Sequence, residues 1–112
     1  MTNWIWVTTQ FEGFHKYPAA PDEVAFLRDR HRHIFKVKVW VEVEHNERDV
    51  EFILFKRDVE SIISYGVTFE LDNKSCESIA DYIQARLFMK YARKMRIEIS
   101  EDGENGCEKE YD

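Results

Sequence analysis

The segment "RDRHRHIFKVKVWVEVE" (residues 28–44) contains the clearest β-strand pattern in the chain and places two histidines at its start. From His33 onward, apolar and polar side chains alternate, which is typical of a strand with one buried face. The residues expected on that face are Phe35, Val37, Val39, Val41 and Val43. His31 and His33 are separated by one residue, so both imidazole rings are expected on the same face of the strand. Such a pair can supply half of a metal site.

The composition of the 112-residue chain favours one folded domain over residues 1–112. Its size is near the range in which association of subunits adds stability. The net charge of −6 makes nonspecific binding to nucleic acid or to anionic lipid unfavourable. Two cysteines are too few for a disulfide framework, and no apolar run is long enough to span a membrane. We therefore expect a cytoplasmic protein.

Further strands are predicted on both sides of this segment. Residues 3–14 are rich in aromatic and β-branched types, as strands are. Pro18 and Pro21 follow and favour a long loop or a bent extension. Near the C-terminus, residues 95–101 alternate again, and residues 107–111 are expected to form a short closing strand.

Two segments show helical spacing instead. In residues 50–66 the apolar residues that recur at this spacing are Phe52, Phe55, Val59, Ile62 and Ile63. Gly66 is a plausible stop for that helix, and Ser75 is a good N-cap for a second helix within residues 74–94. The order of elements predicts an α+β fold, an antiparallel sheet with two helices on one face. Side chains expected to be exposed, and to favour assembly with other subunits, include Trp4, Trp6 and Trp40.

A third histidine, His15, ends the first predicted strand. If the first two strands pair as an antiparallel unit, His15 lies beside the other two histidines. Three neutral imidazoles suit Zn²⁺ and leave the fourth coordination position open for water or substrate. Alternatively, the histidines belong to a solvated strand end that attracts anions through Arg28, Arg30 and Arg32.

The segments "FEGFH" (11–15) and "RHRH" (30–33) resemble the 6-pyruvoyl- and 6-carboxytetrahydropterin synthase family. In that family a Phe-x-Ala-Ala-His segment and a His-Gly-His segment supply the three zinc ligands. Further segments resemble the family in the same order along nearly the whole chain. These are "VEFILFK" (50–56), "SCESIADYI" (75–83), "IEISE" (97–101) and "GCEKEY" (106–111).

The resemblance implies a T-fold (ββααββ), in which a four-stranded antiparallel sheet is backed by two antiparallel helices. It also implies a homohexamer, in which three subunits join their sheets into a barrel and two trimers stack. The pocket would lie between subunits, with His15, His31 and His33 holding Zn²⁺ from one subunit and Glu101 possibly coming from the next. The expected activity is that of a zinc-dependent lyase acting on a dihydroneopterin triphosphate-like substrate, in pterin or 7-deazaguanine (queuosine-type) synthesis.

Glu101 ends the apolar face of the strand formed by residues 95–101. A buried carboxylate is costly unless hydrogen-bond donors satisfy it. The edge of a pterin or guanine ring offers an amino group and an adjacent N–H, and by resemblance Glu101 would anchor such a ring. Alternatively, the strand ends at Glu101 and its side chain points to water.

The sequence departs from the family at the residues that move protons. Leu27 stands where the proton-abstracting cysteine is expected. Of the family's proton-relay pair, the aspartate is retained as Asp72, a candidate catalytic residue by resemblance, but Asn73 stands where the histidine is expected. Neither replacement titrates near neutral pH. Glu23 and Asp29 are nearby candidates for a substitute base, although neither is in register.

Other titratable and charged residues are candidates for the pocket. Cys76 is expected in the first turn of the second helix, where the helix dipole lowers the pKa of a thiol, although an ordinary small residue is the simpler interpretation. Arg28 and Arg32 are expected at the pocket mouth, where they could attract a phosphorylated ligand, or else they form a solvated loop edge.

Two classes of function therefore remain open from the sequence. The first is an active pterin synthase with an unrecognised base. The second is a divergent member of the family that binds a pterin, a guanine derivative or another nucleotide without the original lyase reaction. A metal-free structural oligomer is a third interpretation.

Overall fold

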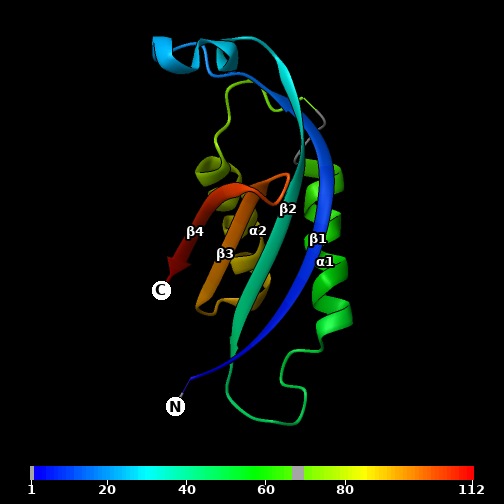
Figure 1. Cartoon of the computed structure of the whole chain (residues 1–112). Helices are drawn as coiled ribbons and strands as arrows, with labels where there is room; N and C mark the ends of the chain where they lie inside the picture. Colours follow the sequence, from blue (N-terminus) through cyan, green and yellow to red (C-terminus); the bar gives the residue numbers. More distant parts are fainter. Residues whose placement is uncertain (1, 67–69) are drawn as a thin grey trace.

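The computed structural model describes residues 2–66 and 70–112 (Figure 1). Within these residues the chain forms a four-stranded sheet, two α-helices and one 3₁₀ helix, η1 (Asp22–Arg28). The strands and α-helices are β1 (Asn3–His15), β2 (His31–Val43), α1 (Phe52–Gly66), α2 (Cys76–Tyr91), β3 (Met95–Glu101) and β4 (Asn105–Tyr111). The ββααββ order confirms the predicted α+β fold.

The sheet has the strand order β1-β2-β3-β4, and every neighbouring pair is antiparallel. β1 and β2 pair over their whole lengths, from Asn3 opposite Val43 to His15 opposite His31. β3 is shorter and pairs only with residues 35–41 of β2. The histidine end of the β1–β2 hairpin therefore extends beyond β3, which leaves room for a site at this end of the sheet (Figure 1).

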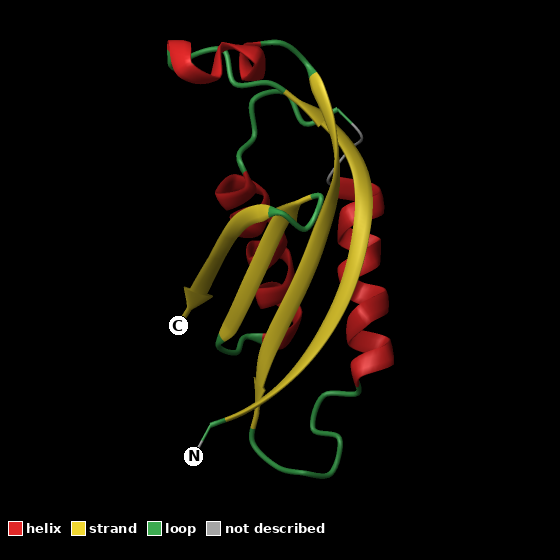
Figure 2. Ribbon diagram, viewed as in Figure 1, coloured by secondary structure: helices red, strands yellow, loops and turns green. Residues whose placement is uncertain are grey.

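The hydrophobic core lies between one face of the sheet and the two helices (Figure 2). Helix α1 packs against β1, and α2 packs against β3 and β4. The alternating residues of β2 that were predicted to face inward are all buried: Phe35, Val37, Val39, Val41 and Val43. Ser75 caps α2 as predicted, because its side chain accepts a hydrogen bond from the backbone N–H of Ser78.

Three local features differ from the sequence-based expectation. The proline-containing segment includes the short helix η1, which follows Pro21 and begins with acidic residues. Phe52 was counted in the buried face of α1, but it is 56% exposed. It stands at the first position of the helix and lines a surface hollow with Trp4 of β1, so it does not join the core. Of the three tryptophans, Trp6 is exposed, and the other two are half-buried.

An ion pair holds the opposite end of the sheet from the histidines. The guanidinium of Arg93, after α2, donates to both carboxylate oxygens of Asp49, at 2.7 and 3.1 Å. The hydrogen bonds from Arg93 and from the backbone N–H of Glu44 hold the pKa of Asp49 well below its usual value. This pair connects the segment after β2 to the turn between α2 and β3.

No helix in the described part of the chain is long and apolar enough to cross a membrane.

Candidate metal centre

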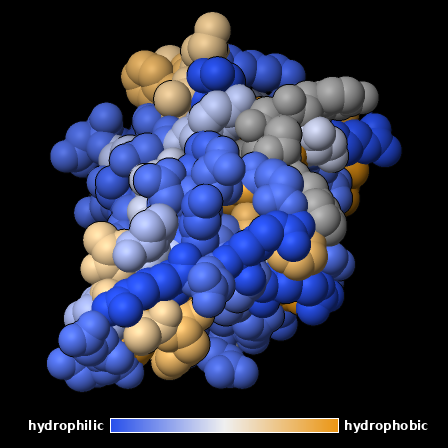
Figure 3. All heavy atoms as spheres, turned by 90° about the horizontal axis from the view of Figure 1, so that it is seen from above, coloured by the Kyte–Doolittle hydropathy of each residue, from blue (hydrophilic) through white to orange (hydrophobic). Residues whose placement is uncertain are grey.

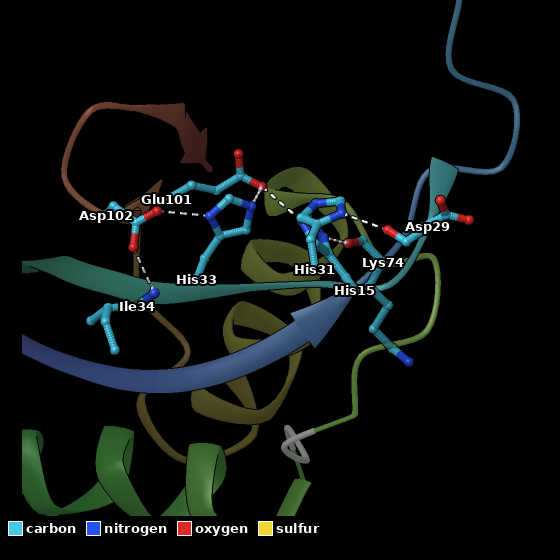
Figure 4. Close-up of polar contacts among 8 residues, drawn as sticks. All are labelled: His15, Asp29, His31, His33, Ile34, Lys74, Glu101 and Asp102. Carbon is cyan, nitrogen blue, oxygen red and sulfur yellow. Dashed lines mark hydrogen bonds and ion pairs between the residues drawn. The ribbon is translucent and has the colours of Figure 1, made fainter. Parts of the chain in front are cut away.

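The three predicted histidines converge at the projecting end of the hairpin (Figure 4). His15 of β1 and His31 of β2 are register partners, and His33 lies two residues further along β2. One ring nitrogen from each histidine lies within 4.8 Å of the corresponding atom of the other two. The convergence predicted from the His-x-His spacing and the antiparallel pairing is confirmed.

Each imidazole is oriented by a hydrogen bond at Nδ1 (Figure 4). Nδ1 of His15 lies 2.9 Å from the backbone carbonyl of Lys74, and Nδ1 of His31 lies 2.8 Å from that of Asp29. A carbonyl oxygen only accepts, so these two Nδ1 atoms carry the proton. His33 Nδ1 lies 2.7 Å from a carboxylate oxygen of Asp102, which is also an acceptor. In the neutral tautomer, each Nε2 then presents a lone pair.

The Nε2 atoms of His15 and His33 are buried and have no hydrogen-bond partner in the part of the chain that the structure describes. Buried polar atoms without a partner are rare, because they carry the full cost of lost solvation. A bound cation would satisfy both atoms. Imidazoles held through Nδ1 by carbonyl and carboxylate oxygens are also the usual arrangement around protein-bound metals. The residues present therefore fit a metal ion at these histidines.

The Glu101 carboxylate lies against the same nitrogen atoms. Its Oε2 is 2.9 Å from Nε2 of His15 and 3.5 Å from Nε2 of His33. The side chain of Glu101 is 24% exposed, so it does not simply point to water. This contact is made within one chain, whereas the resemblance had suggested that the glutamate reaches the site from a neighbouring subunit. The physical reason is that β3 ends beside the hairpin, where Glu101 pairs with Phe35 of β2.

A hollow of about 540 Å³ opens beside the histidines. Its lining includes His15, His31 and Glu101, together with Leu27 and Asn73. The remaining lining residues come from the start of the proline segment, the residues just before and at the start of α2, and the start of β4. The two residues at the expected proton-transfer positions thus lie at this hollow, and neither can exchange a proton near neutral pH.

The carboxylates of the three candidate acid–base residues, Glu23, Asp29 and Asp72, all lie away from the hollow. Glu23 is exposed on η1. Asp29 approaches the site only through its backbone carbonyl, which orients His31. Asp72 is exposed with a left-handed backbone (φ 54°), and its carbonyl accepts a hydrogen bond from the backbone N–H of Lys16. The structure brings none of their carboxylates to the hollow, and a catalytic role for them stays a prediction.

The arginines predicted to bind substrate are held by other partners in this chain. Arg28 donates to the backbone carbonyl of Ala20 and forms an ion pair with Asp22. Arg32 points to the sheet face opposite the histidines, where it pairs with Glu12 of β1. Neither arginine lines the hollow, so their role in substrate binding also stays a prediction.

Cys76 lines the hollow but is not an activated thiol. Burial is the main cause that raises its pKa to about 12, and the nearby Glu101 carboxylate adds to the effect. The expected lowering by the helix dipole is therefore outweighed. The thiol stays protonated at neutral pH, which agrees with the simpler interpretation of Cys76 as an ordinary small residue.

Two parts of the site were missed by sequence reasoning. Asp102 binds His33 Nδ1 and also accepts from the backbone N–H of Ile34, and the first of these bonds holds the pKa of Asp102 below its usual value. Its position directly after Glu101, at the end of the strand, could have indicated this role. The carbonyls of Asp29 and Lys74 have no sequence signal, because every residue carries one.

No family model matches the sequence, and no curated protein matches it. The fold does match solved structures. One is dihydroneopterin aldolase from Burkholderia thailendensis bound to guanine, with a TM-score of 0.54 and 17% sequence identity. The match covers 98% of this chain and 90% of the aldolase chain.

The match establishes the fold of this chain. The ββααββ arrangement is that of a T-fold protein, as the match to the aldolase shows. Within that class, this chain carries a group of three histidines that could hold a metal ion.

Proposed function

We propose that this protein is a zinc-binding T-fold protein of the tetrahydropterin synthase type, whose hollow takes a pterin- or guanine-like heterocycle. The observation that carries the proposal is the convergence of His15, His31 and His33, with two buried Nε2 atoms that form no hydrogen bond. Three imidazoles form the ligand set that catalytic zinc sites often use.

The chain's own residues would hold the ion and restrict its surroundings. His15, His31 and His33 supply Nε2, while the acceptors at Nδ1 fix the tautomer and the ring orientation. Bound zinc would act as a Lewis acid on a hydroxyl or carbonyl oxygen of the ligand. Phe35 packs against the His15 ring, with ring centroids 5.3 Å apart, and separates the site from the core.

The ligand class is inferred from the hollow and from the structural neighbour. A volume of about 540 Å³ lies within the usual range for small-molecule sites. The aldolase with the same fold was solved bound to guanine. Guanine and pterin share an edge with an amino group and a ring N–H, and carboxylates and backbone carbonyls are suitable acceptors for this edge.

Binding without the original lyase reaction is the better supported of the two candidate activities. Leu27 and Asn73 line the hollow, and neither can serve as a general acid or base. A missing base removes about 10²- to 10⁴-fold of rate. The second candidate, an active lyase on a dihydroneopterin triphosphate-like substrate, is favoured by the complete set of three histidines.

We further propose that the protein is a homo-oligomer, a trimer or hexamer. β1 and β4 are the two edges of the sheet, and unpaired edges favour pairing with another chain. The end of the molecule that carries η1 is mostly hydrophilic with separate hydrophobic areas (Figure 3). Phe26 on η1 is 73% exposed, which is consistent with contact to a neighbouring subunit.

The experiment that separates the candidates uses zinc-loaded protein with guanine, pterin and dihydroneopterin triphosphate. Binding of the first two, measured by calorimetry, together with no release of triphosphate from the third, would support a binding protein. Release of triphosphate that depends on His33 would support the lyase. Failure of zinc-loaded protein to bind any of the three would contradict the proposed ligand class.

A further inference from the structure

We propose that Glu101 is a fourth protein ligand of the metal, so that the site is His₃Glu and not an open three-histidine site. This inference rests on the proposed metal binding and goes beyond it. It gives Glu101 a different role from the ring-anchoring role that the resemblance implies.

The first argument is the distance between the donor atoms. Oε2 of Glu101 lies 2.9 Å from Nε2 of His15 and 3.5 Å from Nε2 of His33. Two ligands of one tetrahedral zinc ion are about 3.4 Å apart, given zinc–ligand bonds of about 2.0–2.2 Å. For six-coordinate ions with similar bond lengths the separation is about 3.0 Å. The observed distances of 2.9 and 3.5 Å match these separations.

The second argument is the chemistry of the facing atoms. The Nδ1 atom of each histidine lies against an oxygen acceptor elsewhere, so Nε2 is the ring atom of His15 and of His33 that faces the Glu101 carboxylate. Nε2 of His15 and of His33 form no hydrogen bond, although Glu101 lies so close. A carboxylate oxygen this close to an imidazole nitrogen needs a proton or a metal ion between the two atoms, and a single metal ion can serve both nitrogens at once. A metal ion satisfies all of these atoms together.

The third argument is that the backbone holds Glu101 in place. The residue after it, Asp102, accepts hydrogen bonds from His33 Nδ1 and from the backbone N–H of Ile34, and its own N–H donates to the Ile34 carbonyl. Consecutive residues of one strand end therefore contact both nitrogens of the His33 ring: Glu101 at Nε2 and Asp102 at Nδ1 (Figure 4). A carboxylate fixed in this way needs little reorganisation to bind a metal.

A bound Glu101 changes how the site would work. With Glu101 as a ligand, the coordination position that three histidines leave open would be filled. Ligand binding and coordination by Glu101 would compete for the same position.

The test compares full-length wild type with Glu101→Gln, which keeps the size of the side chain and removes its charge. Glu77→Gln is the matched control, because Glu77 lines the same hollow without an ion pair to the histidines. Zinc affinity is measured by competition with a chromophoric chelator. Coordination is measured by the visible spectrum of the Co²⁺-loaded protein.

Loss of a group that only hydrogen-bonds to a metal ligand lowers metal affinity about 10- to 100-fold. We therefore expect the zinc affinity of Glu101→Gln to fall by at least about 10-fold. We also expect a changed Co²⁺ spectrum in that variant and wild-type behaviour in Glu77→Gln. A second variant, Glu101→Asp, keeps the charge but shortens the reach, and its affinity should also fall if direct coordination matters.

Equal zinc affinity and identical Co²⁺ spectra in wild type and Glu101→Gln would overturn the inference and leave the three-histidine site standing. Full affinity in Glu101→Asp with loss only in Glu101→Gln would also overturn it, because the effect would then be that of charge alone. If wild type binds neither Zn²⁺ nor Co²⁺, the proposed function itself fails.

Discussion

The inward face of β2 has two halves with different chemistry. From Phe35 to Val43 the inward side chains are buried in the hydrophobic core. His31 and His33 continue the same face, but they lie beyond the end of β3 and meet His15 and not the aliphatic core. The difference shows that the residues of β2 that stabilise the fold and the residues that form the candidate metal site occupy separate parts of the strand. One half holds the fold together, and the other half gathers ring nitrogens of which two, both buried, form no hydrogen bond in the described part of the chain.

The largest expected effect is the loss of stability when a residue of the hydrophobic core is truncated. Phe55 is fully buried on α1 and packs edge-on against Tyr91, so Phe55→Ala should lower the free energy of unfolding by about 3–5 kcal/mol. His31→Ala should lower it by only about 1 kcal/mol in metal-free protein, because that half-buried side chain loses one hydrogen bond, to the Asp29 carbonyl. Urea unfolding of chelator-treated samples measures both. Equal losses would contradict the division into two halves.

The next effect concerns the polar half alone. Asp102→Asn weakens the contact that orients His33, so zinc affinity should fall about 10- to 100-fold. A chelator competition assay measures this loss. The unfolding free energy of the metal-free variant provides the control, since a large drop there would show that Asp102 serves the fold more than the site.

A smaller effect connects the two halves through α2. Ser75 caps this helix, and the preceding Lys74 carbonyl holds His15. Ser75→Ala should lower the unfolding free energy by about 1 kcal/mol, the usual value for a lost N-cap. Thermal unfolding measures this loss of stability. Zinc affinity shows whether loss of the cap also disturbs the position of His15. A variant as stable as wild type would contradict the role of the cap.

The smallest effect concerns the end of the sheet far from the histidines. The pKa of Asp49 is lowered in the folded protein, so its ion pair with Arg93 contributes stability above the unfolded pKa of about 3.9. That contribution is lost as the pH falls below this value towards the folded pKa. The melting temperature of wild type should therefore drop more steeply below about pH 4 than that of Asp49→Asn. Parallel pH profiles would contradict this assignment.

The sequence predicted the fold and the histidine group because both depend on simple periodicity. Alternation along β2 placed Phe35 and the valines inward, and it placed His31 and His33 on the same face. The same reasoning found Glu101 at the end of the inward face of β3. Its contacts within the chain could not be predicted, because they depend on how far β3 extends along β2.

Three features could not be read from the pattern of side chains: the carbonyls that orient two histidines, the helix η1 and the exposure of Phe52. The carbonyls that orient His15 and His31 belong to loop residues whose side chains are not involved. The helix η1 was missed because prolines were interpreted as loop residues, although Pro21 followed by acidic residues is a common helix start. Phe52 was misplaced because a helical spacing pattern does not show where the core ends.

The central claim is that the three histidines bind one zinc ion. The most direct measurement is the zinc content of protein reconstituted with excess Zn²⁺ and desalted, for wild type and His31→Ala. His45→Ala serves as the control, because His45 lies in the turn after β2, outside the histidine group. The account predicts zinc near one ion per chain in wild type and His45→Ala, and its loss in His31→Ala. Zinc absent from wild type, or retained in full by His31→Ala, would contradict it.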